Sequence, residues 1–314
     1  MRRSDHIERR LKLHDLRVLI TAAQSGSMLK AAHLLNTSQP AVSRSISELE
    51  HTLGVRLLDR SRQGVAPTIY GQALLDCGAA VFDDLRQGVK KIEFLADPTE
   101  GELRIGSGLP GFGGVVPATI DRFRRNYLRI QIQANILTDP QQQHRALRER
   151  TIDFFVGRLP QPIEKDLEFE TLFQEGLVVV AGAHNRWARH RKIRLAELVA
   201  EPWLLPPFET SAVGSLIAQA FRASGLEVPK NRIMTDAVLF MQSLVANGDF
   251  LSCYSSSPMR LGTVGLGLKV LPVHLPVPRS PFGILRLKNR MLSPAAELFI
   301  QHAREVAKPL AKGK

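Results

Sequence analysis

The side chains best suited to specific hydrogen bonding lie on one face of a helix predicted to begin after Ser38. Ser38 is a good N-cap, and Pro40 fits a first turn because a proline there loses no hydrogen bond. Apolar residues follow at helical spacing along one side, at Val42, Ile46, Leu49 and Leu53. The other side presents, with no acid among them, Gln39, Ser43, Arg44 and Ser47. Amide, hydroxyl and guanidinium groups suit base edges and phosphates in a major groove, although an ordinary amphipathic surface helix has the same pattern.

Two shorter helices precede this one and must hold it in place. Apolar residues between positions 13 and 23 predict the first helix, and Ser27 can cap the second. A tight polar turn then leads to Ser38, which gives the order and spacing of a helix–turn–helix. Farther along, two short extended runs predict a β-hairpin, with Arg60 and Arg62 at or beside its glycine-containing tip.

Together these segments resemble the DNA-binding domain of the LysR-type transcriptional regulators, over about residues 11–71. The motif residues are Gly26-Ser27, Ala31-Ala32, Leu34, Ser38 to Arg44, Leu49-Glu50, Leu53-Gly54, Leu57-Leu58, Arg60, Thr68 and Gly71. The resemblance implies a winged helix-turn-helix domain over 11–68, with the helix-turn-helix at about 28–47. It implies contact with bases from the helix after Ser38, and with DNA from the wing at Arg62. The expected DNA-binding residues are Ser27, Ser38, Gln39, Pro40, Ser43, Arg44, Ser47 and Arg62. The sequence departs from the family pattern at Leu58, where many members have Phe, and at Gln63, where some have a wing arginine.

A long helix is predicted after the hairpin, over about residues 69–97. Steps of three and four separate Leu75, Gly78, Phe82, Leu85, Val89, Ile92 and Ala96. This seam could pack on the helix's own domain or against a second long helix. The family resemblance implies the second arrangement, a linker helix that pairs two subunits in a homodimer, and it further implies a homotetramer. Asp97-Pro98-Thr99 breaks the helix and marks a domain boundary.

Residues 101–314 alternate strand and helix patterns. Such alternation predicts parallel α/β architecture, with enough strands for two small sheets. This part resembles the two-lobed, periplasmic-binding-protein-like effector domain of LysR-type regulators. The resemblance implies a first lobe of about 101–170 and 273–310, a second lobe of about 171–272, and a cleft between them. The expected fold class is therefore α/β with an N-terminal all-α winged helix-turn-helix.

One motif in this second domain admits two kinds of ligand. The segment Gly106–Gly111 reads G-x-G-x-x-G after a strand and before a helix, the pattern of a dinucleotide-binding turn. However, Asp139 lies 28 residues past the last glycine, rather than the roughly 20 of that fingerprint, and Pro110 stiffens the turn. An anion held by free N–H groups is the preferred interpretation. An NAD(P)-binding enzyme or redox sensor is the alternative.

The ends of the predicted strands supply the candidates for an effector site. In the family the loop after the first strand lines the effector cleft, and Arg158 could pair with an anionic effector. Capping is the alternative use of the threonine and serine side chains, and core packing is the alternative for Tyr254. The expected effector-binding residues are Ser107, Gly108, Leu109, Pro110, Thr138, Arg158, Phe208, Thr210, Ser211 and Tyr254.

Composition limits the remaining classes. The net charge of +12 favours nucleic acid as a partner, although residues 1–70 hold only 11 Lys and Arg against 6 Asp and Glu. The longest stretch without a charged residue is 16 residues, too short and too broken for a transmembrane helix. No signal peptide is evident, and the two cysteines lack metal-ligand spacing. We therefore expect a cytoplasmic protein with reduced thiols.

No enzyme constellation is found, since G-x-S-x-G, H-E-x-x-H and P-loop motifs are all lacking. We predict a sequence-specific regulator of transcription that is not an enzyme and uses no cofactor or metal. Its predicted partners are double-stranded DNA, a small effector of anionic character and further copies of itself, with no membrane. A solute-binding protein with an added helical domain is a second alternative.

Overall fold

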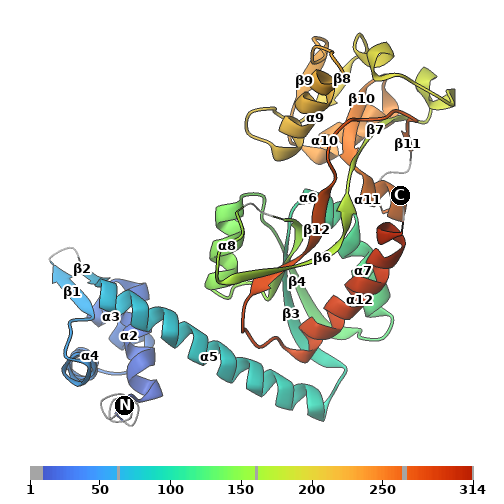
Figure 1. Ribbon diagram of the computed structural model, residues 1–314. Helices are drawn as coiled ribbons and strands as arrows, with labels where there is room; N and C mark the ends of the chain where they lie inside the picture. Colours follow the sequence, from blue (N-terminus) through green and yellow to red (C-terminus); the bar gives the residue numbers. More distant parts are fainter. Residues whose placement is uncertain (1–9, 62–63, 160–161, 264–266, 313–314) are drawn as a thin grey trace. The chain divides into compact units, whose positions relative to one another are not determined.

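The computed structural model describes residues 10–61, 64–159, 162–263 and 267–312 (Figure 1). The chain divides into two compact units, Met1–Val89 and Lys90–Lys314. In the described residues, no helix is both long enough and apolar enough to cross a membrane.

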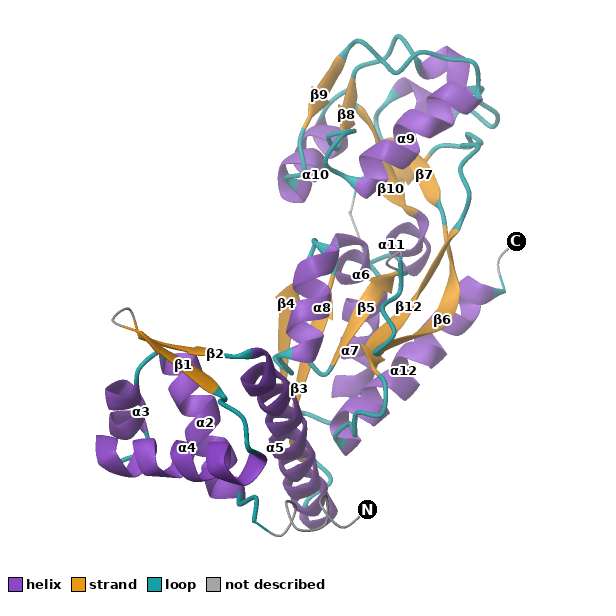
Figure 2. Cartoon of the chain, turned by 60° about the vertical axis from the view of Figure 1, so that its left-hand side comes forward, coloured by secondary structure: helices purple, strands orange, loops and turns teal. Residues whose placement is uncertain are grey.

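Helices and a β-hairpin build the first unit (Figure 2). The elements are α2 (Leu13–Ser25), α3 (Met28–Leu34), α4 (Gln39–Leu53), β1 (Leu58–Ser61) and β2 (Gly64–Pro67). Their shared core contains Val18, Leu19, Ala31, Val42 and Ile46, all buried. The apolar spacing predicted as helix faces therefore forms the core, and the winged helix-turn-helix fold is confirmed.

Local signals in the sequence set the ends of these helices. The side chain of Ser27 accepts a hydrogen bond from the Lys30 amide, and that of Ser38 accepts one from the Ala41 amide. Gly54 ends α4 with φ of 72°, a left-handed conformation that glycine adopts without steric cost. These caps fix where α4 begins and ends, and so which of its residues face outward.

Helix α5 (Ile69–Ala96) follows the hairpin and continues into the second unit. The predicted seam divides along its length. Its first half packs on its own domain, because Gly78 lies against Ile20 and the Phe82 ring lies under the Arg17 guanidinium, 5.0 Å from its centroid. Its second half leaves an exposed apolar stripe of Leu85, Val89, Ile92 and Leu95. Each of the two interpretations of the seam therefore fits one half of the helix.

The second unit contains two five-stranded sheets, which we call lobe 1 and lobe 2 with their covering helices. Lobe 1 has strand order β4-β3-β5-β12-β6. Its strands are β3 (Glu100–Ser107), β4 (Arg129–Ile136), β5 (Phe154–Arg158), β6 (Leu167–Glu175) and β12 (Ser280–Leu287). Its helices are α6 (Leu109–Gly113), α7 (Val115–Arg124), α8 (Pro140–Arg148) and α12 (Pro294–Ala311).

Lobe 2 has strand order β11-β7-β10-β8-β9. Its strands are β7 (Leu177–Gly182), β8 (Trp203–Leu205), β9 (Arg232–Met234), β10 (Leu251–Ser255) and β11 (Leu268–Val270). Its helices are the 3-10 turns η1 (Arg186–Arg189) and η2 (Leu195–Leu198), and α9 (Ala212–Ala223) and α10 (Val238–Asn247). Helix α11 (Ser256–Leu261) follows β10 and also contacts α6 and α7 of lobe 1. Buried Trp203 and Phe221, in edge-to-face contact, lie in its core.

The predicted parallel arrangement holds for β3 with β4 and β5 and for β8 with β9 and β10, but each sheet also contains antiparallel strands. Strand β12 runs antiparallel to both β5 and β6, and β7 runs antiparallel to β10. The chain leaves lobe 1 through β6 and returns to it through β12, so these neighbouring strands must run in opposite directions. Strand β6 also extends lobe 1 to Glu175 rather than to residue 170, and Gly176 alone separates it from β7.

Candidate DNA-binding face and effector cleft

The outward face of α4 carries the side chains that the sequence places there. Gln39, Pro40, Arg44 and Ser47 are exposed and Ser43 is half-buried, while Val42 and Ile46 on the other side are buried. This face offers hydrogen-bond donors and acceptors of the kinds that read base edges. Of the remaining predicted residues, Ser27 and Ser38 serve as helix caps, as the sequence predicts, and Arg62 lies outside the described residues.

The wing strand reaches this face through Arg60. Its guanidinium Nη1 donates to the Ser43 hydroxyl at 3.3 Å. A positive charge from β1 therefore lies beside the α4 face. The arrangement enlarges the cationic surface available to phosphates beyond Arg44 itself.

Two contacts missed by the sequence analysis hold α4 in position. The Ser45 hydroxyl donates to the buried Asp15 carboxylate at 2.7 Å, which joins α4 to α2. At the other end of α4, Glu50 Oε1 accepts the amides of Leu57 and Leu58 at 2.8 and 3.2 Å. Both carboxylates therefore have structural roles. The sequence signals for them are an acid beside the apolar residues of a helix and, for Glu50, its place in the family motif.

In the second unit, Arg158 at the end of β5 reaches from lobe 1 to lobe 2. Its Nη2 donates to the Ser255 hydroxyl at the end of β10, at 3.2 Å. Its Nε is buried, and none of the described residues accepts a hydrogen bond from it. Burial lowers the pKa of the Arg158 guanidinium below its usual value, an effect that the charge of Glu175 opposes. Arg158 is half-buried, and its buried Nε lacks an acceptor among the described residues, so an anion bound there would form a charge-assisted hydrogen bond.

Glu175, which the sequence analysis missed, organises the junction of the lobes. Its buried carboxylate accepts the amides of Gly176, Ser256 and Ser257 at 3.0–3.1 Å and the hydroxyls of Ser256 and Ser257. The acceptor therefore comes from the end of β6 and most donors from the first turn of α11. This network fixes α11 beside the crossing from lobe 1 to lobe 2. The Ser-Ser-Ser run at 255–257 was the available signal.

The G-x-G-x-x-G loop is built for packing rather than for a pyrophosphate. A side chain at Gly111 would clash with the Ser107 hydroxyl and lie 2.9 Å from the Val156 carbonyl oxygen. The Ser107 hydroxyl itself donates to that carbonyl at 2.6 Å. Pro110 has no N–H, and the Gly111 amide already donates to the Gly108 carbonyl, so α6 keeps little anion-binding capacity of its own. The geometry therefore favours tight packing of the loop against β5.

The remaining effector candidates serve different purposes. Thr138 and Thr210 are exposed, Ser211 caps α9 by accepting the Gly214 amide, and Phe208 stacks under the Arg232 guanidinium. The hydroxyl of Tyr254 is buried, with no partner among the described residues, and burial raises the pKa of this phenol to about 12. Side chains alternate along a strand, so Tyr254 and Ser255 point to opposite faces of lobe 2. Arg158 therefore contacts Ser255, whereas the Tyr254 side chain points away from Arg158.

The cysteines and metal-ligand residues support no separate chemistry. Cys253 is buried, and burial raises the pKa of its thiol to about 12, which keeps it in the unreactive protonated form. Cys77 is exposed and belongs to the other unit. Across the described part of the chain, no group of three or more His, Cys, Asp and Glu side chains could hold a metal ion.

Two family models match the chain. The LysR substrate binding domain matches residues 96–308, and the bacterial regulatory helix-turn-helix protein of the lysR family matches residues 13–72. The chain belongs to the LysR family.

Individual relatives agree with this assignment. The SDS degradation transcriptional activation protein of a Pseudomonas species is 30% identical to this LysR-family chain over 297 residues, covering 91% of it and 93% of the relative. The transcriptional regulator GbpR of Azospirillum brasilense is 26% identical over 292 residues, covering 92% and 85%. The crystal structure of full-length CbnR with its target DNA has 22% identity and a TM-score of 0.54, covering 95% and 100%, and shows the shared fold.

This LysR-type protein is therefore a DNA-binding transcriptional regulator with an effector-binding domain. Its relatives are regulators rather than enzymes. Neither the dinucleotide-binding alternative nor the solute-binding alternative accounts for the N-terminal domain, and both are disfavoured.

Proposed function

We propose that the exposed face of α4 reads an operator. In this proposal Gln39, Pro40, Ser43 and Arg44 meet the bases, while the remaining predicted residues, Ser27, Ser38, Ser47 and Arg62, contact the flanking backbone. The observation that carries the proposal is the polar α4 face, exposed and without an acid among its predicted contacts, beside Arg60. This face would enter the major groove while the hairpin approaches the adjacent backbone. The regulator would act in the cytoplasm, where the DNA is.

The exposed stripe of α5 supports self-association. Leu85, Val89, Ile92 and Leu95 repeat at steps of three and four and are all exposed in the single chain. A second copy of the linker helix, about residues 69–97, would cover this stripe and give a homodimer with two recognition helices. Two such dimers would give the homotetramer that the family resemblance implies.

We further propose that a small organic anion binds between the lobes and pairs with Arg158. The free Nε of Arg158 and its link to Ser255 support this site, because an anion there would touch both lobes. The candidate walls are Ser107, Gly108, Leu109, Pro110 and Thr138 from lobe 1, and Phe208, Thr210, Ser211 and Tyr254 from lobe 2. Such a ligand regulates only if its affinity differs between two arrangements of the protein.

DNA binding is tested on the intergenic duplex upstream of the protein's own gene. Fluorescence anisotropy is measured at two salt concentrations with an excess of random duplex. Retention of binding against competitor supports operator recognition. Binding only at low salt, and equally to any duplex, would mean that the α4 face binds DNA by charge alone, without sequence specificity.

Self-association is tested with a matched pair on α5. Ile92→Glu places a charge in the exposed stripe, whereas Lys91→Glu introduces the same residue one position away. Light scattering is expected to show loss of the dimer for Ile92→Glu only. Equal oligomers for both variants would contradict pairing through this stripe.

Effector binding is tested by thermal shift with a panel of small mono- and dicarboxylates. A true cleft ligand is expected to raise the Tm of the wild type and not that of Arg158→Gln. Shifts of equal size in both proteins would place the ligand elsewhere.

A further inference from the structure

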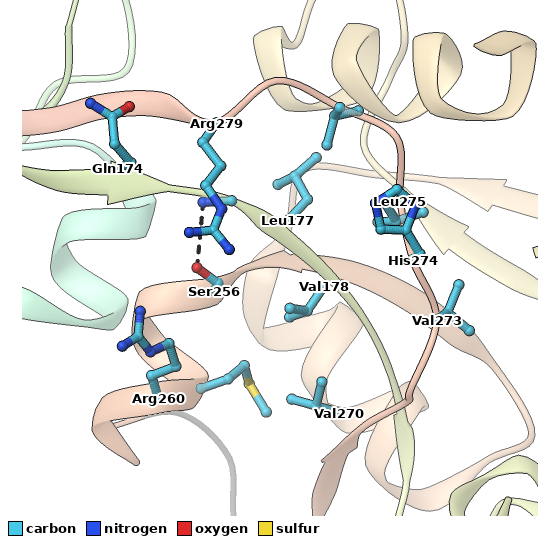
Figure 3. A pocket seen from close by; sticks show the side chains of 13 residues that line it. Gln174, Leu177, Val178, Ser256, Arg260, Val270, Val273, His274, Leu275 and Arg279 are labelled. Carbon is cyan, nitrogen blue, oxygen red and sulfur yellow. Dashed lines mark hydrogen bonds between the residues drawn. The ribbon is translucent and has the colours of Figure 1, made fainter. Parts of the chain in front are cut away.

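A cavity of about 500 Å³ lies between the two chain segments that connect the lobes (Figure 3). The first connection is Gly176, between β6 and β7, and the second is residues 271–279, between β11 and β12. The size falls within the range of about 300–1,000 Å³ that small-molecule sites occupy. None of the residues proposed for the effector cleft lines this hinge cavity.

The charged residues of the lining are two arginines. Arg260 of α11 and Arg279 of the second connection extend toward Ser256 from opposite sides, and His274 lies across the cavity from them (Figure 3). No Asp or Glu is among the lining residues. The guanidinium of Arg260 donates to the carbonyls of Pro309 and Leu310 at 2.8 and 3.1 Å, which fixes its position. A guanidinium has more donors than these two contacts use, so it can also bind a ligand oxygen.

The rest of the lining is mainly apolar. Its apolar side chains are Leu177, Val178, Met259, Val270, Val273, Leu275 and Val277, and Gln174 and Gly176 complete the lining. The apolar side chains come from β7, α11, β11 and the second connection. A ligand that satisfies both parts needs an anionic head for the arginines and a hydrocarbon portion for the valines and leucines.

We propose that the hinge cavity binds a small amphipathic organic anion, at a site additional to the effector cleft. The head group lies between Arg260 and Arg279, and the apolar portion lies along Val270 and Val273. A ligand in this position touches both connections at once. Its binding therefore responds to the angle between the lobes and favours the angle at which it fits best.

The cavity also shares a neighbour with the cleft. Ser256 lines the cavity, and its hydroxyl donates to the Glu175 carboxylate at 2.7 Å. The charge of Glu175 in turn acts on Arg158, the proposed anion-binding residue of the cleft. A head group that draws on the Ser256 hydroxyl would change the surroundings of Glu175, so occupancy of the cavity and of the cleft would be coupled.

The test is isothermal titration calorimetry of the full chain with octanoate, below its micellar concentration, and with neutral octanamide. Octanoate is expected to bind saturably, once per chain and at least tenfold more tightly than octanamide. The Arg260→Gln/Arg279→Gln double variant is expected to lose at least tenfold in octanoate affinity. Arg222→Gln, which removes an exposed arginine of α9, should remain within twofold of the wild type.

Two further variants locate the site. Val270→Trp fills the cavity from a position that is 42% exposed, so it should block octanoate without removing core packing or either arginine. Arg158→Gln removes the cleft arginine and leaves every residue of the cavity lining in place, so saturable octanoate binding should persist, changed only a few-fold through Glu175. Loss of binding in Arg158→Gln with retention in Val270→Trp would place octanoate in the cleft and overturn the proposal. Absence of saturable binding to the wild type would overturn it as well.

Discussion

The α4 face and the cleft between the lobes differ in how their parts are brought together. Every predicted base contact on α4 comes from one helix, and one amphipathic pattern decides which residues are exposed. The cleft instead joins Arg158 to Ser255, which are 97 residues apart in the sequence. A local site is therefore set by helix period and capping. A site formed by residues distant in the sequence depends instead on buried contacts that fix the positions of the two lobes.

The largest effect is expected for Glu175→Ala, which removes the buried contacts at the junction of the lobes. Glu175→Ala leaves the buried amide and hydroxyl donors of Ser256 and Ser257 without their acceptor. We expect the free energy of unfolding of the second unit to fall by about 3 kcal/mol or more, because unsatisfied buried donors cost about 1–3 kcal/mol each. Urea denaturation measures the change.

Glu209→Ala, at an exposed glutamate, is the control for that experiment and should change stability little. Unchanged stability of Glu175→Ala would mean that the cleft is held by contacts other than this network, and the contrast with α4 would weaken.

The next effect concerns the local site. Arg44→Ala is expected to lower operator affinity by about 1–3 kcal/mol, the value of a good base contact, while affinity for random duplex changes little. Anisotropy titrations with both duplexes measure it. Arg56→Ala removes the same charge from an exposed position after α4 and should affect the two duplexes equally. An equal loss on both duplexes for Arg44→Ala would assign this arginine to phosphates.

A third experiment compares a residue that holds α4 in place with a residue on its exposed, DNA-binding face. Ser45→Ala removes the buried hydroxyl that binds Asp15 and is expected to cost about 1–2 kcal/mol of stability. Ser47→Ala, the same substitution on the exposed face, should remain within about 0.5 kcal/mol of the wild type. Thermal unfolding compares them, and equal losses would show that burial does not distinguish the two serines.

The smallest effect is an exposed ion pair with a pH signature. The Arg304 guanidinium on α12 binds Glu170 of β6 through two oxygens, at 2.7 and 2.8 Å, and lowers the pKa of that carboxyl. A lowered pKa stabilises the fold above the unfolded-state value, and this contribution disappears as pH falls through the folded-state value. Glu170→Gln should therefore cost about 0.5 kcal/mol at pH 7 and less as the pH approaches 3.

Denaturation at pH 7 and at lower pH gives the comparison for Glu170→Gln. Asp236→Asn, at an exposed carboxylate, serves as the control and should show no comparable trend. A Glu170→Gln cost that grows on acidification would contradict the direction of the shift.

Much of the first unit follows from the sequence, because its signals are local. The caps at Ser27 and Ser38, the glycine at 54 and the spacing from Val42 to Leu53 all act within one or two helical turns. By contrast, the partners of Asp15 and Glu50 lie on other elements, and nothing in the local pattern identifies them.

In the second unit most helices and strands were predictable, but the short helices α6 and α11, the antiparallel strands and the buried polar contacts were not. Strand β6 carries glutamates at 168, 170 and 175, which interrupt the apolar pattern of the strand. For this reason the sequence did not show that lobe 1 extends to Glu175. Arg158 was identified as a candidate from its place at a strand end. Its partner Ser255 and the neighbouring Glu175 required knowledge of how two distant segments meet.

The two connections between the lobes differ in backbone flexibility. Gly176 is a single residue with no side chain, and it is held by hydrogen bonds in which its amide donates to Glu175 and its carbonyl accepts from the Ser256 amide. Without those bonds it could adopt torsions that other residues cannot. The second connection contains Pro272, Pro276 and Pro278, whose rings fix their own φ angles. Rotation of one lobe against the other is then expected to change the torsions of Gly176 and to break its hydrogen bonds. The first connection is therefore the expected hinge, and the prolines of the second connection restrict the directions in which the lobes can rotate.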